Sequence, residues 1–274
     1  MTKSRKMVFD NMNQAGYGVG SYKGRHADLY DVFYSEKPYT AEADFIYSCF
    51  KKYGNGPLNR LLELACGTGT HAFELEKKGV LVTALDYSED MIRCAREKAL
   101  NNHSNVDFHR EDMRSFVFAP PSFDGVYCLF DSIGYVSTND SVIRVIQNVS
   151  KHLRPGGIFI FEFWHAAAMI LHHESMRTRE WNTPKGKILR ISNTTLNYQQ
   201  QTADVEYSIY ELNHDGTYSF LQETQTNRFF SQGEMELLLL KGGLTPLKWL
   251  NGFSEDERIT DETWHIVALA KKEN

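Results

Sequence analysis

Residues 59–71 of the chain, NRLLELACGTGTH, decide the fold. An apolar run ends in a glycine-rich turn, and this turn opens a helical stretch at 70–78. Glycines between a strand and a helix let a ligand approach the backbone closely, at the end of the sheet where doubly wound α/β folds bind ligands. The motif therefore predicts a strand, a binding turn and a helix in direct succession.

The alternation of apolar runs and helical stretches continues on both sides of this motif. Further helices are predicted at 39–53, 90–100 and 140–152, and further strands at 80–85, 105–110, 123–129 and 158–163. Strands and helices that alternate at this spacing indicate βαβ units, and strands buried on both faces of a sheet read as apolar runs. The sequence therefore predicts an α/β fold with a doubly wound, mostly parallel sheet.

The pattern changes after Trp164. Residues 187–230 alternate between apolar and polar side chains, are rich in Thr, Tyr and Asn, and contain the turn sequences YQQQ and NHDG. This pattern predicts an antiparallel meander of three strands. A helix at 232–241 and strands at 244–253 and 263–271 then return to the first pattern and bring the main sheet to seven strands.

These patterns divide the chain into parts with different roles. We expect residues 1–40, rich in Tyr and Gly, to form an N-terminal clasp or lid. Residues 41–164 and 231–274 are expected to form the sheet domain, and residues 165–230 an inserted antiparallel subdomain on the substrate side.

Composition and charge restrict the class of protein. The 274 residues carry a net charge of −5, and Lys and Arg are scattered rather than gathered into the basic stripe of a nucleic-acid-binding protein. The four cysteines form no CxxC or CxH cluster, which argues against zinc and suggests no disulfides. The N-terminus lacks the apolar stretch of a signal peptide, and no run reaches the ~20 apolar residues of a membrane span. We expect a cytoplasmic enzyme with a small-molecule substrate and no metal, nucleic-acid or membrane partner; assembly into a homodimer stays open.

Acidic residues near the ends of the first three strands indicate what the glycine turn binds. Taken alone, the turn also fits a dinucleotide fingerprint, but Glu63, four residues before the first glycine, would repel a pyrophosphate and could instead hold an ammonium group. Asp86 stands 19 residues after Gly67, where it can accept hydrogen bonds from ribose hydroxyls in either class of cofactor. Asp112 follows the third strand and could accept a hydrogen bond from an adenine amino group, or cap a helix.

With these residues in view, a resemblance to a known family follows. ELACGTGTH, LDYSEDMI, REDMRSF, FDGVYCLFDSIGYV and LRPGGIFIFEFW resemble the successive motifs of class I S-adenosylmethionine-dependent methyltransferases, over about residues 58–164. HADLYDVFY at 26–34, FDSIGY and the late antiparallel insertion resemble the sugar N,N-dimethyltransferases of the desosamine and mycaminose type, and glycine and sarcosine N-methyltransferases share the plan more distantly. FEFWHAAA departs from the proline-bearing segment expected after the fifth strand, which leaves the acceptor open.

The resemblance implies a Rossmann-like fold, S-adenosyl-L-methionine as the cofactor, and N-methylation of an amino group such as that of an amino sugar. The residues it places at the cofactor are Tyr30, Glu63, Ala65, Cys66, Gly67, Gly69, Asp86, Tyr87, Met91, Asp112, Met113 and Phe130. Met91 could equally be a core residue, and Cys66 is expected to be a small residue beside the cofactor rather than a nucleophile, because nothing near it suggests an activated thiolate.

The resemblance also points to residues on the acceptor side. Tyr34 is the first candidate for orienting the acceptor amine and Tyr135 the second. Aromatic enclosure favours a transition state in which the sulfonium loses its charge, and Tyr17, Tyr22, Tyr30 and Tyr34 could supply it or could simply pack a helix.

Two residues carry the open alternatives for the chemistry. Asp131 could hold the acceptor as an ammonium ion or cap the following helix. His165, just past the fifth strand, is a candidate general base, and an O-methyltransferase acting on a small molecule would need such a base. A non-catalytic subunit that binds S-adenosylmethionine for a partner is the remaining alternative.

Overall fold

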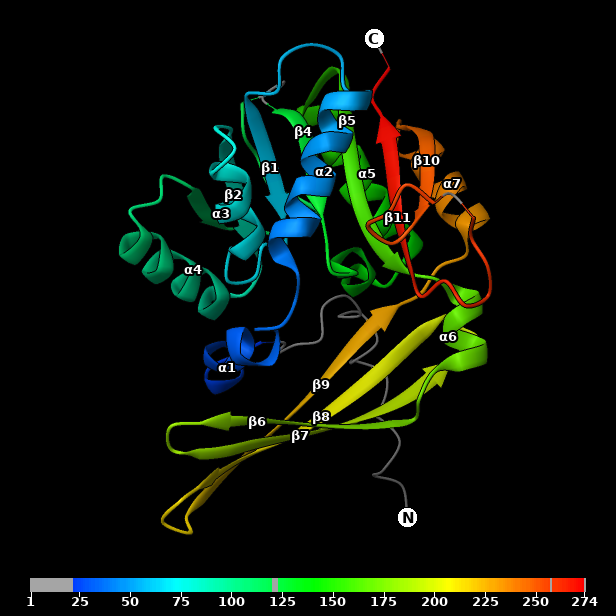
Figure 1. Ribbon diagram of the computed structural model, residues 1–274. Coiled ribbons are helices and arrows are strands. Elements are labelled where there is room, and N and C mark those ends of the chain that lie inside the picture. Colours follow the sequence, from blue (N-terminus) through cyan, green and yellow to red (C-terminus); the bar gives the residue numbers. More distant parts are fainter. Residues whose placement is uncertain (1–21, 120–122, 257, 274) are drawn as a thin grey trace, which may run out of the picture.

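The computed structural model describes residues 22–119, 123–256 and 258–273. These residues form a seven-stranded sheet with helices on both faces and a separate four-stranded antiparallel sheet. The four-stranded sheet lies across the end toward which the parallel strands of the larger sheet point (Figure 1).

The seven-stranded sheet has the strand order β10-β11-β5-β4-β1-β2-β3. In chain order its strands are β1 (Arg60–Leu64), β2 (Leu81–Asp86), β3 (Asp107–Arg110), β4 (Phe123–Cys128), β5 (Leu153–Trp164), β10 (Thr245–Asn251) and β11 (His265–Lys271). Strands β1 to β5 pair in parallel, whereas β11 is antiparallel to both of its neighbours. The order reverses between β1 and β4, which is the switch point where doubly wound folds bind ligands.

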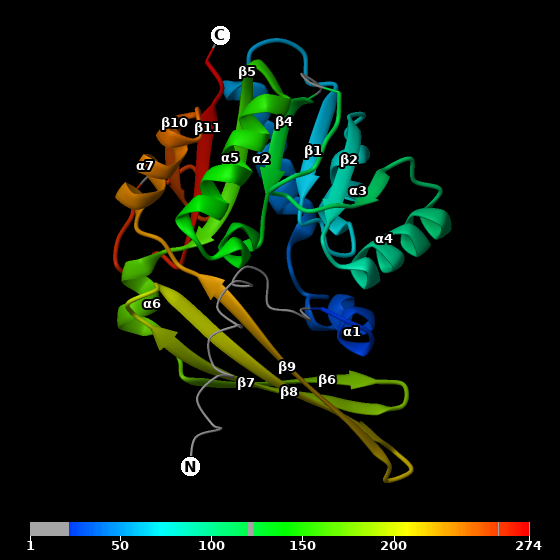
Figure 2. The ribbon, with the colours of Figure 1, turned by 180° about the vertical axis from the view of Figure 1, so that it is seen from behind.

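Alternate residues of each strand enter two different cores. On β5, Ile158 and Ile160 belong to one core cluster, while Phe159 and Phe161 belong to the other. Helices α2 (Tyr39–Tyr53), α3 (Thr70–Glu76) and α4 (Glu89–Asn102) cover the first face, and α5 (Asn139–His152) and α7 (Gln232–Lys241) cover the second (Figures 1 and 2). The predicted α/β, doubly wound, mostly parallel seven-stranded sheet is therefore confirmed.

Hydroxyl side chains fix where the helices begin. Ser88 accepts a hydrogen bond from the backbone of Met91 at the start of α4, and Thr138 accepts one from Ser141 at the start of α5. Such N-caps satisfy backbone donors that the first helical turn leaves unpaired.

The four-stranded sheet corrects the prediction of a three-stranded meander. Its strands are β6 (Met176–Thr183), β7 (Gly186–Asn197), β8 (Thr202–Asn213) and β9 (Tyr218–Arg228), in that order. The additional strand, β6, lies at an edge and is mostly exposed, so its sequence MRTREWNT shows no apolar alternation. A strand that is exposed to solvent on both faces shows no alternation of apolar and polar residues by which it could be predicted.

Three short helices were not predicted: α1 (Arg25–Phe33), the 3-10 helix η1 (Ser132–Val136) and α6 (Ala166–His172). Leu29 and Phe33 of α1 pack against Ile188 and Ile209 of the four-stranded sheet, so α1 lies between the two sheets (Figure 1). None of the helices in the described part of the chain combines the length and the apolar character that a membrane crossing needs.

The fifth strand also begins earlier than predicted. Leu153 already pairs with Phe123, and the register then shifts before Gly125 pairs with Ile158. The RPGG sequence, which precedes the predicted strand at 158–163, is therefore an irregularity within β5.

Candidate active site

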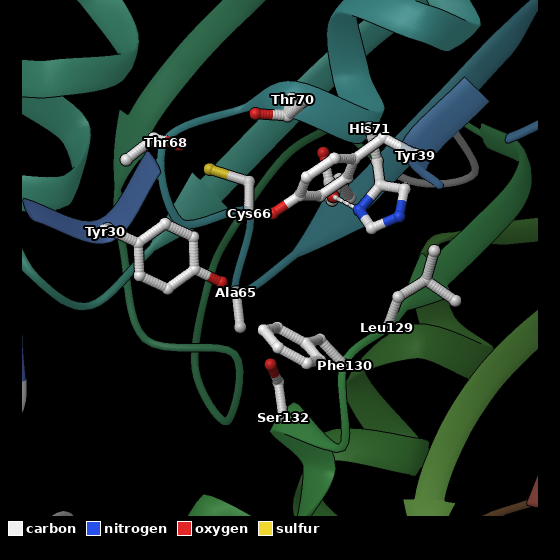
Figure 3. A pocket seen from close by; sticks show the side chains of 11 residues that line it. Tyr30, Tyr39, Ala65, Cys66, Thr68, Thr70, His71, Leu129, Phe130 and Ser132 are labelled. Carbon is white, nitrogen blue, oxygen red and sulfur yellow. Dashed lines mark ion pairs between the residues drawn. The ribbon is translucent and has the colours of Figure 1, made fainter. Parts of the chain in front are cut away.

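A pocket opens at the switch point, beyond the carboxyl ends of β1 and β4 (Figure 3). It contains about 340 Å³ of space free of protein atoms, including space open to solvent. The residues that line it are Tyr30, Tyr39, Glu63, Ala65, Cys66, Thr68, Thr70, His71, Leu129, Phe130 and Ser132. Five of these were predicted at the cofactor: Tyr30, Glu63, Ala65, Cys66 and Phe130. Its position, beyond the carboxyl ends of the parallel strands, is that of a small-molecule site.

The glycine turn after β1 forms one wall of this pocket. Ala65, Gly67 and Gly69 have positive φ angles of 53°, 56° and 80°. A Cβ atom on Gly69 would lie 2.5 Å from the ring of Phe108, so only glycine fits there. Ala65 adopts the left-handed conformation without being glycine, and such strain is concentrated at ligand sites.

Asp86 ties this turn to the end of β2. Its carboxylate oxygens accept hydrogen bonds from the backbone N–H groups of Gly67 and Ser88, both at 2.8 Å. Burial raises its pKa. Each carboxylate oxygen has two lone pairs, so Asp86 can still accept hydrogen bonds from a ligand hydroxyl.

Glu63 is a buried carboxylate at the base of the pocket, 2% exposed. Its Oε2 accepts a hydrogen bond from the hydroxyl of Tyr127 at 3.2 Å, and its Oε1 lies 3.9 Å from Nδ1 of His71. Burial raises the pKa of Glu63 to about 8. The Nε2 atom of His71 is hydrogen-bonded to Oε2 of Glu42 at 2.7 Å. Burial lowers the pKa of His71. Glu63 therefore has no close cation among the described residues and could pair with a cationic group of a ligand.

The loop after β4 faces the glycine turn across the pocket. Phe130 and Asp131 are two consecutive non-glycine residues with positive φ angles, 57° and 56°. The backbone N–H of Phe130 donates to Oε2 of Glu162 at 2.7 Å, which holds the strained turn in place. The Phe130 ring then lies 4.8 Å from the ring of Tyr34.

Next to this loop, His265 joins two buried carboxylates. Its Nδ1 lies 3.0 Å from Asp131 and 3.1 Å from Glu162. Burial alone would lower the pKa of His265, but the two carboxylates raise it to about 11, so the ring stays protonated at neutral pH. Asp131 makes no capping hydrogen bond at η1, so the helix-cap interpretation of its side chain is wrong.

Tyrosines from α1, its flanks and the β4 loop gather on the side of the pocket that faces the four-stranded sheet. Ring centroids of Tyr30 and Tyr34 are 4.7 Å apart, and those of Tyr22 and Tyr30 are 5.4 Å apart. The hydroxyls of Tyr22 and Tyr135 lie 3.2 Å apart, and Tyr135 donates to Gln225 of β9 at 3.0 Å. Tyr17, also predicted here, lies outside the described residues.

Residues 61–157 match the family model described as a methyltransferase domain. This segment, which includes β1 and the glycine turn, is therefore similar to a methyltransferase domain. Over 145 residues it is 34% identical to the dTDP-3-amino-3,4,6-trideoxy-alpha-D-glucopyranose N,N-dimethyltransferase of Streptomyces venezuelae, a match that covers 52% of this chain and 59% of that protein. The match thus spans little more than half of that relative's length.

Solved structures share the fold outside the methyltransferase domain as well. An S-adenosylmethionine-dependent methyltransferase from Clostridium acetobutylicum superimposes with a TM-score of 0.79 at 22% identity, covering 91% of this chain and 98% of that one. DesVI from Streptomyces venezuelae gives a TM-score of 0.75 at 25% identity, covering 90% and 99%. The resemblance to class I methyltransferases is confirmed.

Several residues predicted at the cofactor of the methyltransferase domain do not line the pocket. Met91 and Met113 are buried in the core, and Tyr87 is 49% exposed. Asp112 is held by Arg114, whose Nε lies 3.0 Å from both carboxylate oxygens, and it also accepts from the Arg114 backbone at 2.8 Å. The cofactor roles of these residues stay predictions. Asp112 caps no helix, because the described residues between β3 and β4 form none; its backbone contact belongs to a turn.

His165 follows the carboxyl end of β5, at the same edge of the sheet as the glycine turn but two strands away from β1. Its Nδ1 is 3.1 Å from the backbone carbonyl of Thr263, and it is not among the residues that line the pocket. Burial lowers its pKa. Its role as a general base therefore stays a prediction, and neither of these observations supports it.

Six pocket residues were not predicted. Thr68, Thr70 and His71 stand inside the quoted glycine motif, where their types alone give no signal, and Leu129 and Ser132 flank the predicted Phe130. Tyr39, the first residue of α2, reaches the pocket only through tertiary packing. Its hydroxyl is buried without a hydrogen-bond partner (Figure 3).

Proposed function

We propose that this chain is an S-adenosylmethionine-dependent methyltransferase that methylates an amino group of a small molecule, with an amino sugar as the acceptor. One observation carries the proposal. In a pocket walled by a glycine turn, the described residues provide no close cation for the buried carboxylate of Glu63 and no hydrogen-bond partner for the buried hydroxyl of Tyr39. Both groups fit the ammonium and polar atoms of S-adenosylmethionine.

The chain's own residues would hold the cofactor by complementary charge and hydrogen bonding. Glu63 would bind the ammonium group, Asp86 the ribose hydroxyls and Asp112 the adenine amino group. S-adenosylmethionine, when bound, supplies an activated methyl group. The protein needs to align the acceptor with that group and exclude water, and positioning of this kind supplies several kcal/mol of a barrier.

The tyrosine cluster suits the acceptor side of this reaction. Burial raises the pKa of Tyr22, Tyr30 and Tyr135 well above the ordinary value, so these hydroxyls stay neutral at physiological pH. They can orient an amine by hydrogen bonds, and their rings exclude water. An amine must be neutral to attack, and a desolvated site lowers the pKa of an ammonium group. Tyr34 and Tyr135 are the residues we propose to orient it.

The amino-sugar acceptor is supported by the name of the Streptomyces venezuelae relative, an N,N-dimethyltransferase of a dTDP-linked amino sugar. The net charge of −5 supports a small-molecule acceptor over a nucleic acid. A cytoplasmic location and a homodimer remain predictions. So does the division into an N-terminal lid (1–40), a sheet domain and a substrate-side insertion (165–230).

The test is methyl transfer from labelled S-adenosylmethionine to matched acceptors. We expect a dTDP-linked amino sugar to gain one or two labelled methyl groups by mass spectrometry, and the same sugar with a hydroxyl in place of the amine to gain none. His165→Ala should leave this transfer intact. Transfer only to the hydroxyl compound, lost in His165→Ala, would establish the O-methyltransferase alternative instead.

A further inference from the structure

Arg190, on β7, is a buried cation without a counterion. Arg190 is 7% exposed, and its Nε and Nη1 atoms are buried without a hydrogen-bond partner in the part of the chain that the structure describes. Across the described residues, no carboxylate forms an ion pair with it. Buried charges are normally paired, because removing a guanidinium from water is unfavourable unless its donors are satisfied.

Aromatic rings surround this guanidinium. Its central carbon lies 4.9 Å from the ring centroid of Phe33, 5.1 Å from Trp181, 5.3 Å from Tyr207 and 5.7 Å from Tyr34. Ring faces attract a cation. They do not satisfy the N–H donors, which point outward in the plane of the guanidinium. The surroundings therefore stabilise the charge and leave its hydrogen-bonding capacity unused.

The carboxylate in the same neighbourhood is already engaged. Glu223 of β9 is paired in register with Tyr207, one of the rings around Arg190. Its oxygens, however, accept from the backbone of Tyr22 at 2.7 Å and from Gln225 at 2.9 Å, and one lies 3.0 Å from His26. Among the described residues, Arg190 is therefore left without a carboxylate partner.

The location connects Arg190 to the methyl-transfer site. Tyr34 contacts Tyr30 and Phe130, which line the pocket, on one side, and Arg190 on the other. A molecule that presents its amine near Tyr34 and extends away from the pocket would thus reach the guanidinium. Phe33 and Tyr34 belong to the last turn and C-cap of α1.

We infer that Arg190 binds an oxyanion carried by the acceptor, a phosphate or a carboxylate group, and so selects acidic acceptors. The inference rests on the proposed function, because it assigns the second end of the same substrate. The rigid fork of a guanidinium matches two oxygens of such a group, which lysine could not do.

The experiment is calorimetric titration with inorganic pyrophosphate and, separately, with acetate. The proteins are the wild type, Arg190→Met and the control Arg25→Met, whose arginine is half exposed and paired with Glu211. We expect the wild type and Arg25→Met to bind at least one anion, and Arg190→Met to bind it at least tenfold more weakly. The preferred anion distinguishes a phosphate-bearing acceptor from a carboxylate-bearing one. Equal binding by the wild type and Arg190→Met, or no binding of either anion by the wild type, would overturn the inference.

A second measurement does not depend on the folding of the variant. Trp181 lies beside Arg190, so anion binding to the wild type should change its fluorescence, and a silent titration would contradict the inference. Titration with S-adenosylmethionine is run in parallel. If the cofactor fails to bind but the anion binds through Arg190, the proposed function is refuted and the anion site is supported. If the cofactor binds but the anion does not, only the anion site is refuted.

Discussion

The Nδ1 atom of His265 lies 3.0 Å from the carboxylate of Asp131, which is the second of two consecutive residues in the left-handed backbone conformation. Glu162 holds the same strained turn by accepting a hydrogen bond from Phe130. One protonated imidazole therefore lies between two carboxylates and reduces their mutual repulsion beneath the loop that shapes the pocket.

Replacing His265 by Gln should destabilise the protein by about 1–2 kcal/mol at neutral pH. Removing one partner of a fully buried ion pair costs more, but the His265 side chain is 41% exposed, so solvent screens part of the effect. Because its folded pKa is raised, the stability it contributes is complete below its unfolded pKa of about 6.5 and declines as pH rises toward about 11. Urea unfolding at pH 6 and pH 10 measures this. The control His172→Gln, at an exposed pair, should change little; a similar loss in both variants would contradict the account.

Glu63→Gln should weaken binding of S-adenosylmethionine by about 10- to 100-fold, the range for a hydrogen bond to a charged group. The pKa of Glu63 is raised to about 8, so the side chain is mostly protonated at pH 7 and must ionise to pair with an ammonium group. Wild-type binding at pH 7 should therefore release a proton, seen as a dependence of the calorimetric heat on the buffer's ionisation enthalpy. The dependence should vanish in Glu63→Gln and persist in Glu97→Gln, an exposed carboxylate.

The same shift predicts how stability without ligand depends on pH. A carboxyl with a raised folded pKa contributes stability that is complete below its unfolded pKa and is lost as pH rises through the folded value, here between about 4.5 and about 8. Wild-type stability should thus fall over that interval more steeply than that of Glu63→Gln, in chemical unfolding at pH 5 and pH 8.5. Parallel curves would show that Glu63 is not the titrating group.

Gly69→Ala should be more damaging than Gly56→Ala. Both glycines have a strongly positive φ, 80° and 92°, so both substitutions introduce backbone strain of about 1 kcal/mol. The new Cβ meets nothing within 4 Å at Gly56, but at Gly69 it lies 2.5 Å from the Phe108 ring, which should add about 1–3 kcal/mol. Thermal unfolding of the two variants separates the effect of the clash from that of backbone strain. An equal loss of stability in both variants would contradict the close approach of Gly69 to Phe108.

Tyr39→Phe should lower the affinity for S-adenosylmethionine severalfold without destabilising the free protein. The hydroxyl is buried and unpartnered in the pocket, so its removal from the free protein loses no hydrogen bond. Calorimetry and thermal unfolding together test this. Tyr198→Phe, at a 62% exposed site, serves as the matched control. Unchanged affinity in Tyr39→Phe would mean that the hydroxyl does not contact the cofactor.

The sequence predicted the larger sheet because its central strands β1, β4 and β5 are mostly buried on both faces, and because helices follow β1, β2 and β4 in the chain. The glycine turn and Glu63 were predicted for a related reason, since they share one continuous segment. Strand β6 was missed because its two faces are mostly exposed, and α1 because only a short apolar face contacts the other sheet.

Contacts between segments that lie far apart in the sequence could not be predicted from it. Asp131, Glu162 and His265 come from the ends of β4, β5 and β11, and only the strand order β11-β5-β4 brings them together. Tyr39 reaches the pocket through the packing of α2 against α3. Arg190 of the four-stranded sheet packs against Phe33 of α1. Residue type alone does not distinguish such positions from ordinary surface residues.

The central claim is tested most directly by calorimetric titration of the purified protein with S-adenosylmethionine and, separately, with NAD. We predict micromolar binding of S-adenosylmethionine, strongly weakened in Asp86→Ala, and no binding of NAD. Binding of NAD without binding of S-adenosylmethionine would contradict the account and make the glycine turn a dinucleotide site.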